Sequence, residues 1–290
     1  MKFYSHITSE KYIVKRKPGL TIKRSICSGF TLATVAKVRA DKGYRVKSFS
    51  ELVKCIAELG SRNSRFNLLF RGQGNDYKDS NNRTKLYPSI YRPVNSNGRL
   101  STVKLQKRLK NLKELIYALS KNRKNLGLSG YLLKHQEYWE AIIQHYNLCP
   151  TRLLDLTQSI RVAATFALYD INSNKDREDG FVYVLGFPHP NGSISTYADD
   201  ELILVRLQSV CPPEAYRPHF QEGFLAGRWP RSKTKDAEAN FAYWLLAKYR
   251  LTNKNNKFFD KEFPPIPYRV LIPEKDPFKD KLLNIINHQR

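Results

Sequence analysis

The segment around Arg71 combines residue types that suit the binding of an anion. Arg71 follows a short apolar run, Phe66 to Phe70, and precedes Gly72. A guanidinium group at the end of a buried strand can hold a phosphate or a carboxylate through two parallel hydrogen bonds. A glycine beside it lets the backbone approach a ligand closely. The alternative is structural: Arg71 forms an ion pair with a buried aspartate such as Asp155.

A second group of polar residues lies between His145 and Thr157. His145 could transfer a proton or orient a hydroxyl group, or it could be a core histidine at a helix end. Arg152 and Asp155 lie in an apolar stretch where unpaired charges are costly, so they either pair with each other or shape a pocket. Thr157 lies at a predicted strand-to-helix junction, where it could receive an anion or simply cap the helix.

Gln221 and Glu222 belong to a third candidate segment, a short predicted strand over residues 220–227. Neighbouring residues of a strand face opposite ways, so only one of the two could face a pocket shared with Arg71. If that residue is Gln221, the pocket lacks the carboxylate that would stabilise an oxocarbenium-like transition state. Glu222 would supply this carboxylate only if a β-bulge turned it inward.

The elements that must position these residues are predicted from apolar periodicity and turn residues. Predicted strands cover residues 66–70, 151–156, 180–187, 201–208, 220–227 and 268–273. Predicted helices cover residues 48–59, with Gly60 ending the helix, 102–124, 131–146, a segment starting at Thr157 or Ser159, 236–249 and 276–287. Because these elements alternate without a regular βαβ period, we expect an α+β fold with a single mixed or antiparallel sheet as its core and flanking helices.

Charge is the most unusual feature of the composition. The chain has 50 Lys and Arg against 26 Asp and Glu, a formal net charge of +24. Residues 1–47 hold 12 basic and 2 acidic residues, which predicts a basic N-terminal arm or small subdomain ahead of one domain over 48–290. The predicted helix 102–124 has eight basic residues and one acid, Glu114. The arm and this helix could bind nucleic acid, or their charges could simply solvate exposed faces.

Several classes of protein are not indicated. The four cysteines, at positions 27, 55, 149 and 211, form no CxxC pair, so neither a zinc site nor a disulfide framework is expected, and no metal ligands are assigned. A reducing compartment fits this cysteine usage. The chain lacks both a signal-peptide apolar core and a run of about 20 apolar residues. We therefore expect a cytoplasmic protein that does not enter a membrane.

Four segments, taken in order and spacing, resemble the FRG family, which is named for its Phe-Arg-Gly triplet. They are FRGQG (70–74), LYPSIYR (86–92), QHYNLCPTRLLDLTQSIRVAATFAL (144–168) and RPHFQEGF (217–224). The resemblance extends over roughly residues 48–290. It departs from the family pattern at Asn147, where a glycine is usual, and at Cys149, which lengthens the stretch before Pro150 by one residue.

The motif order is also similar, at the level of fold, to that of ADP-ribosyltransferases. This resemblance implies a pocket for a nucleotide-like ligand, with NAD as the candidate substrate for ADP-ribosyl transfer or NAD cleavage. Its ligand-binding residues would be Phe70, Arg71, Gly72, Gln73, Arg152, Asp155 and Thr157, and its catalytic candidates Gln221, Glu222 and His145. The alternative is a non-catalytic binding module whose basic surface binds nucleic acid.

Overall fold

The computed structural model describes residues 21–26, 29–93, 100–128, 130–170, 173–229 and 239–288, with side chains from residue 34 onward. The chain forms two compact units, each built from three stretches of sequence. Unit 1 comprises Met1–Leu86, Leu156–His189 and Phe241–Leu271. Unit 2 comprises Tyr87–Asp155, Pro190–Asn240 and Ile272–Arg290. The two units are described separately below.

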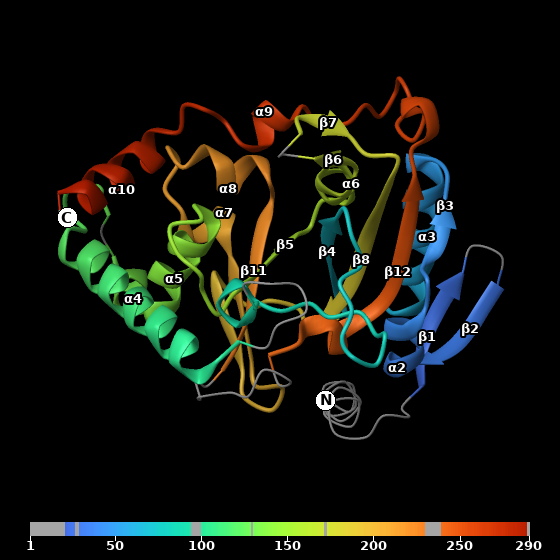
Figure 1. Cartoon of the computed structure of the whole chain (residues 1–290), viewed down its shortest axis with the longest axis horizontal. Coiled ribbons are helices and arrows are strands. Elements are labelled where there is room, and N and C mark those ends of the chain that lie inside the picture. The colour runs from blue at the N-terminus through green and yellow to red at the C-terminus, as the bar shows by residue number, and fades with distance from the viewer. Residues whose placement is uncertain are drawn as a thin grey trace. The chain divides into compact units, whose positions relative to one another are not determined.

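Unit 1 is built on a mixed sheet in the order β3-β12-β8-β4-β5 (Figure 1). The strands are β3 (Tyr44–Val46), β4 (Asn67–Gln73), β5 (Leu154–Thr157), β8 (Asp179–Phe187) and β12 (Leu245–Thr252). The pairing of β3 with β12 is parallel, and the others are antiparallel. The chain enters unit 1 from unit 2 within β5, so that the second half of this strand, Leu156 and Thr157, belongs to unit 1.

Two helices cover one face of this sheet. Helix α3 (Phe49–Arg62) begins at Ser48, whose hydroxyl accepts a hydrogen bond from the Glu51 amide, and it continues past the predicted end at Gly60. Helix α6 (Ile160–Leu168) begins at Ser159 in the same way. Apolar residues of both helices share a buried cluster with alternate residues of β4, β8 and β12, so this face holds the core of unit 1.

The remaining elements of unit 1 are short. They are the paired strands β1 (Thr21–Ile26) and β2 (Gly29–Thr34), helix α2 (Val35–Ala40), the paired strands β6 (Tyr169–Asp170) and β7 (Lys175–Asp176), the 3₁₀ turns η3 (Phe241–Trp244) and η4 (Lys254–Asn256), and helix α9 (Tyr268–Leu271). Strand β3 lies within residues 1–47, so this part of the predicted arm pairs with the sheet of unit 1. The division into residues 1–47 and 48–290 stays a prediction.

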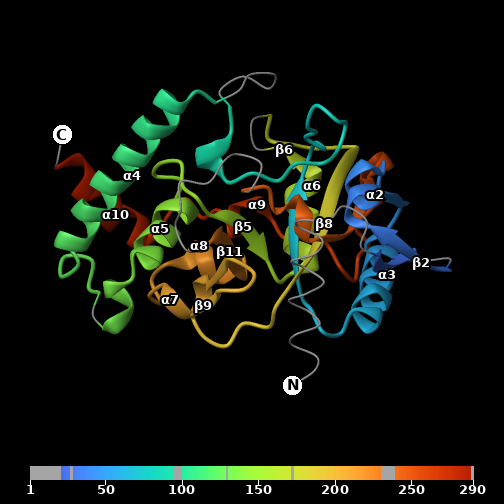
Figure 2. The ribbon, with the colours of Figure 1, turned by 90° about the horizontal axis from the view of Figure 1, so that it is seen from below.

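Unit 2 packs helices against three antiparallel strands in the order β11-β10-β9. The strands are β9 (Ile194–Tyr197), β10 (Leu202–Arg206) and β11 (Gly223–Arg228). The helices are α4 (Thr102–Lys121), α5 (Gln136–His145), α7 (Leu207–Val210), α8 (Tyr216–Phe220) and α10 (Pro277–Asn287), with 3₁₀ turns η1 (Ser89–Tyr91) and η2 (Tyr131–Lys134). Helix α10 lies beside α4, as both ribbon views show (Figures 1 and 2), and one buried cluster joins α4, α5, α10 and the strands.

The predicted α+β class, with a mixed and mostly antiparallel sheet and flanking helices, is confirmed. Two local predictions are wrong, and a third places the start of a strand too early. The predicted helix over 236–249 is, in its described part, a 3₁₀ turn followed by β12, and the predicted strand over 268–273 is helix α9. Pairing with β3 and β8 makes the first of these segments a strand in spite of its helix-forming residues. The second segment has β-forming residues but is helical instead. The predicted strand over 220–227 begins only at Gly223.

Two further findings concern the cysteines and the membrane. Cys149 and Cys211 are free, whereas Cys55 is disulfide-bonded, which the spacing of the cysteines did not indicate. None of the helices in the described segments combines the length and the apolar character needed to cross a bilayer.

Candidate functional site

The FRG strand, β4, presents different chemistry on its two faces. Phe70 and Gly72 face the helical side, where Phe70 joins the buried cluster with the alanines of α6. A Cβ atom added to Gly72 would lie 1.8 Å from the backbone oxygen of Ala163, closer than any real contact. Gly72 is therefore needed for the close contact between β4 and α6. This structural role explains the glycine without the ligand contact that the sequence analysis predicted.

Arg71 and Gln73 leave β4 on the opposite face. The Arg71 Nε donates a hydrogen bond to the Gln73 Oε1 at 3.2 Å, and both side chains are half-buried. In the antiparallel register with β8, Arg71 pairs with Tyr183. Burial first, and then the neighbouring Asp76 carboxylate, raise the pKa of Tyr183 above its ordinary range. A polar face therefore lies across β4 and β8.

Thr157 does not share this face with Arg71. Its register partner on β4 is Phe70, and directly paired residues project on the same side of a sheet. The Thr157 hydroxyl accepts a hydrogen bond from the Ser159 amide at 3.0 Å, which shapes the turn into α6. The register therefore gives no support to a single pocket lined by Arg71 and Thr157.

A buried polar network holds the loop that follows the FRG strand. Lys248, fully buried on β12, donates hydrogen bonds from Nζ to Asp76 at 2.7 Å and to the Thr84 hydroxyl at 2.8 Å. Asp76 also accepts from the hydroxyls of Thr84, at 2.7 Å, and Tyr183, at 3.1 Å. Arg39 donates to the Thr84 carbonyl oxygen at 3.0 Å.

Sequence reasoning missed this network because it assigned Lys248 to a helix. One signal was available: Lys248 interrupts the apolar stretch from Phe241 to Tyr249, where a lysine needs a buried partner.

In unit 2, helix α5 holds the polar residues of the 144–168 motif. Glu140 binds the Arg152 guanidinium through both carboxylate oxygens, at 3.2 and 2.9 Å, and also accepts from the Arg152 amide. Gln144, one helical turn later, donates to Asp155 at 2.5 Å and accepts a hydrogen bond from the Thr151 hydroxyl. Arg152 thus pairs with Glu140 rather than in the expected Arg–Asp pair. These contacts make the motif a scaffold that fixes the segment leading into β5.

His145 ends α5 inside the core of unit 2. It is buried, and its ring packs edge-on against Tyr146 with centroids 5.8 Å apart. Burial, followed by the Arg217 charge, lowers the pKa of His145 well below its ordinary value, while a backbone hydrogen bond with Arg217 opposes this. A histidine that stays neutral and enclosed fits the structural alternative better than proton transfer.

Gln221 and Glu222 lie before β11 and not within it. Gln221 is buried at the C-terminal cap of α8, where its backbone amide donates a hydrogen bond to the Arg217 carbonyl oxygen at 3.1 Å. Glu222 has a left-handed backbone with φ of 46° and leads into Gly223. The strand alternation expected for this pair is therefore wrong. Both residues belong to unit 2, whereas Arg71 and Thr157 belong to unit 1.

Among the side chains that the structure describes, no three His, Cys, Asp or Glu residues are grouped so that they could hold a metal ion. The Cys211 thiol is buried, and burial raises its pKa, so it is a poor nucleophile in this state.

Comparison with known proteins identifies one segment of the chain. Residues 66–176 match the family model of the FRG domain. No curated protein and no solved structure matches the chain. The matched segment runs from the start of β4 to the end of β7, and it includes Gly72 and the scaffold around Arg152 and Asp155. This chain is therefore an FRG domain-containing protein.

Proposed function

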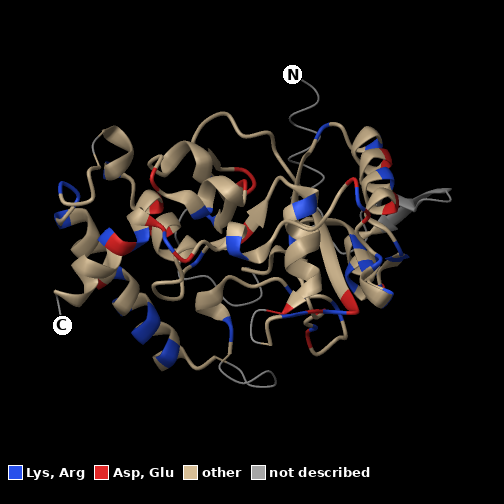
Figure 3. Ribbon diagram, turned by 90° about the horizontal axis from the view of Figure 1, so that it is seen from above, with Lys and Arg blue, Asp and Glu red and all other residues tan. Residues whose placement is uncertain are grey.

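We propose that this protein is a non-catalytic binding module that holds nucleic acid on the basic face of α4. This basic face consists of seven exposed side chains on the helix and the turn after it: Lys104, Lys107, Lys110, Lys113, Lys121, Arg123 and Lys124. Glu114 is the one acid in residues 102–124. Figure 3 shows basic residues recurring along this helix.

The basic face is separate from the side of α4 that packs into the core. Leu112, Ile116 and Leu119 are buried in the cluster of unit 2. Arg108 lies toward this side and donates to the carbonyl oxygens of Ile90 and Arg92 at 2.7 Å, so it supports the fold and is not part of the basic face. Of the remaining cations, Lys110 makes a long ion pair with the exposed Glu114 at 3.8 Å, a weak surface contact that a phosphate can replace. Lys104 and Lys107 lie near the N-terminal end of α4, where a positive charge opposes the helix dipole, so they do not stabilise the helix.

Length and aromatic content also suit a nucleic acid. Lys107 and Lys121 are 14 residues apart on the helix, which places them about 21 Å apart along its axis at about 1.5 Å per residue. That span covers several phosphates of a duplex, which carries one charge per about 1.7 Å of axis. Tyr117 is 68% exposed on the same side and offers a ring for an unpaired base.

The reason to propose binding without catalysis is that the motif side chains of unit 2 are occupied internally. Arg152 is held by Glu140, Asp155 accepts from Gln144, and His145 is enclosed and neutral. A catalytic centre would leave acid, base and anion-binding groups facing a substrate.

Replacing Lys107, Lys110 and Lys121 with alanine is expected to weaken binding to a short DNA duplex at least ten-fold at about 0.1 M salt. Because each lost phosphate contact removes about 0.9 from the slope of log K against log salt, the slope should fall by about 2 to 3. Fluorescence anisotropy over a salt series measures both quantities, and a single-stranded RNA of equal length tests the preferred form.

The matched control replaces Lys254, Lys257 and Lys261, three exposed lysines of unit 1, with alanine. This variant loses the same charge away from α4 and should bind DNA nearly as wild type does. Equal losses in the two variants, or no binding by wild type, would show that the basic face is not a nucleic-acid site.

A second candidate function is the binding of NAD or a similar nucleotide by the polar face around Arg71. The observation in its favour is that Arg71 stays half-exposed beside Gln73 and Tyr183, so its guanidinium group could hold a phosphate. On this proposal NAD raises the melting temperature of wild type by mass action, and Arg71→Ala abolishes the rise. Arg45→Ala, an exposed arginine of β3, is the control. An NAD response that survives Arg71→Ala, or no response in wild type, rejects this candidate.

A further inference from the structure

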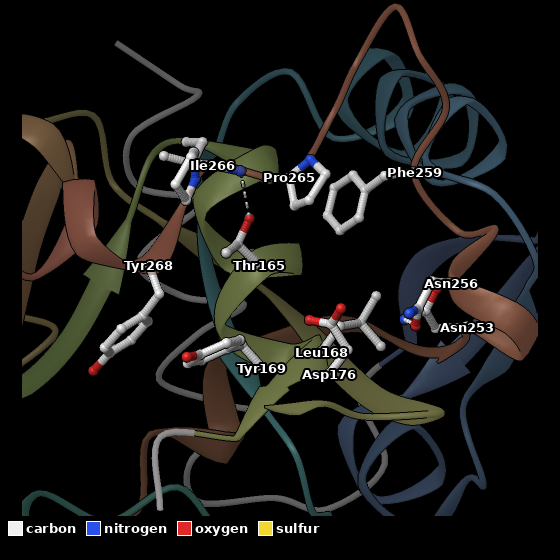
Figure 4. Close-up of a pocket in the computed structure, with 11 residues that line it drawn as sticks. Thr165, Leu168, Tyr169, Asp176, Asn253, Asn256, Phe259, Pro265, Ile266 and Tyr268 are labelled. Carbon is white, nitrogen blue, oxygen red and sulfur yellow. Dashed lines mark hydrogen bonds between the residues drawn. The ribbon is translucent and has the colours of Figure 1, made fainter. Parts of the chain in front are cut away.

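Unit 1 contains a pocket that neither the basic face nor the FRG strand explains. It has a volume of about 200 Å³, roughly the room of seven water molecules at about 30 Å³ each. Its walls come from the end of α6, the strands β6 and β7, and the segment that follows β12 (Figure 4). A space of this size suits a ligand no larger than an amino acid.

The charge of the pocket is opposite to that of the chain. Of the eleven residues that line it, all within the described segments, Asp176 is the one with a charged side chain. Lys175 precedes it on β7 and therefore projects to the other side of the strand, and Arg177, which follows the strand, pairs with Asp170 at 3.0 Å. The Asp176 carboxylate is exposed and has no hydrogen bond or ion pair within the described part of the chain. An anion would be repelled here, and a cation would be attracted.

Other polar groups of the lining are already used to hold the walls in place. The side-chain amide of Asn253 donates hydrogen bonds to the Arg177 carbonyl oxygen at 3.2 Å and to Asn256 Oδ1 at 3.3 Å. Asn253 Oδ1 accepts a hydrogen bond from the backbone amide of Phe258. The Thr165 hydroxyl accepts from the Ile266 amide at 3.3 Å, as the dashed line in Figure 4 shows. These hydrogen bonds fix the walls of the pocket, and the Asp176 carboxylate stays available to accept a hydrogen bond from a ligand.

Aromatic rings form the apolar walls. Tyr169 and Tyr268 stack with centroids 4.7 Å apart and planes 17° apart. Phe259 lies on another side of the pocket and stacks on Phe49 at 5.5 Å, which fixes its ring (Figure 4). Aromatic faces attract cations, and a carboxylate at a rim strengthens this attraction through a charge-assisted hydrogen bond.

We propose that this pocket binds a small organic cation, an amine or a guanidinium group on a compact apolar body. The apolar body lies against Tyr268 and Phe259, and the cationic group pairs with Asp176. This site is independent of the basic face of α4, which would bind anions.

Three probes that share a phenyl group but carry a cationic, a neutral or an anionic end group test whether binding requires a positive charge. They are 2-phenylethylamine, 2-phenylethanol and phenylacetate. Saturation-transfer NMR and calorimetry should detect saturable binding of the amine, at least ten-fold weaker binding of the alcohol, and no binding of the carboxylate. Equal affinity for the amine and the alcohol, or no saturable amine binding up to about 10 mM, would overturn the proposal.

Two substitutions then test the residues. Asp176→Asn should weaken amine binding at least ten-fold and leave binding of the alcohol unchanged. Asn256→Asp, at a residue with φ of 54° that aspartate tolerates, adds a second carboxylate and should tighten amine binding several-fold. Glu262→Gln, which changes a charge on the same segment outside the lining, is the control. Amine binding that survives Asp176→Asn, or that responds equally to Glu262→Gln, contradicts the assignment of Asp176.

Discussion

Replacing Gly72 with alanine is expected to destabilise the protein by about 3 kcal/mol and to lower its melting temperature by about 6–12 °C. The added methyl group would lie 1.8 Å from the Ala163 oxygen and 2.9 Å from the Ala167 nitrogen, both backbone atoms of α6. A helix backbone cannot rotate out of the way as a side chain can, so either β4 or the whole of α6 must shift. Thermal unfolding followed by circular dichroism measures the effect.

Gly192→Ala is the matched control for this substitution. A Cβ atom at Gly192 would meet only the Ile194 oxygen at 3.8 Å, an ordinary contact, and the residue is exposed. Its melting temperature should stay within a degree or two of wild type. If Gly72→Ala behaves like Gly192→Ala, close contact between β4 and α6 is not the reason for glycine at this position.

The sequence predicted best those elements whose periodicity is long or whose ends have clear capping residues. Helix α4 was predicted from leucines at helical spacing, and α3 from a capping serine, Ser48 or Ser50, followed by an apolar face. The first part of β12 falls within the predicted helix 236–249, and its alanine, leucine and lysine residues are good helix formers. Pairing with β3 and β8 decides its structure, and a single sequence does not reveal these partners.

The candidate site illustrates the same limit. Arg152 and Asp155 were expected to need partners because charges in an apolar stretch are costly. Their actual partners, Glu140 and Gln144, lie four residues apart on α5, where they share one face of the helix. The need for partners follows from residue type, whereas the identity of the partners depends on how α5 packs. For the same reason, the role of Gly72 became evident only from its distance to α6.

Replacing Asp76 with asparagine is expected to destabilise the protein by about 3–5 kcal/mol, the usual cost of leaving a buried charge without its partner. Lys248 is fully buried and pairs with Asp76, whose side chain is 7% exposed, at 2.7 Å. The double variant Asp76→Asn with Lys248→Met should lose less stability than the sum of the two single variants, because it leaves no unpaired charge. Chemical denaturation of all four proteins measures the coupling.

The exposed pair Lys110–Glu114 is the control, since its atoms lie 3.8 Å apart and its side chains are 78% and 62% exposed. Glu114→Gln should change stability by no more than about 0.5 kcal/mol.

The dependence of stability on pH adds a test specific to Lys248. Burial lowers its pKa, while the Asp76 carboxylate opposes this shift, so Asp76→Asn lowers the pKa of Lys248 further. Between that pKa and the ordinary lysine value of about 10.4, the unfolded state binds more protons than the native state, and stability rises with pH. The deficit of Asp76→Asn relative to wild type should therefore shrink as the pH is raised toward about 9.5. A deficit that does not change with pH would mean that the loss comes from the hydrogen bonds of Asp76 to Thr84 and Tyr183, and not from the charge of Lys248.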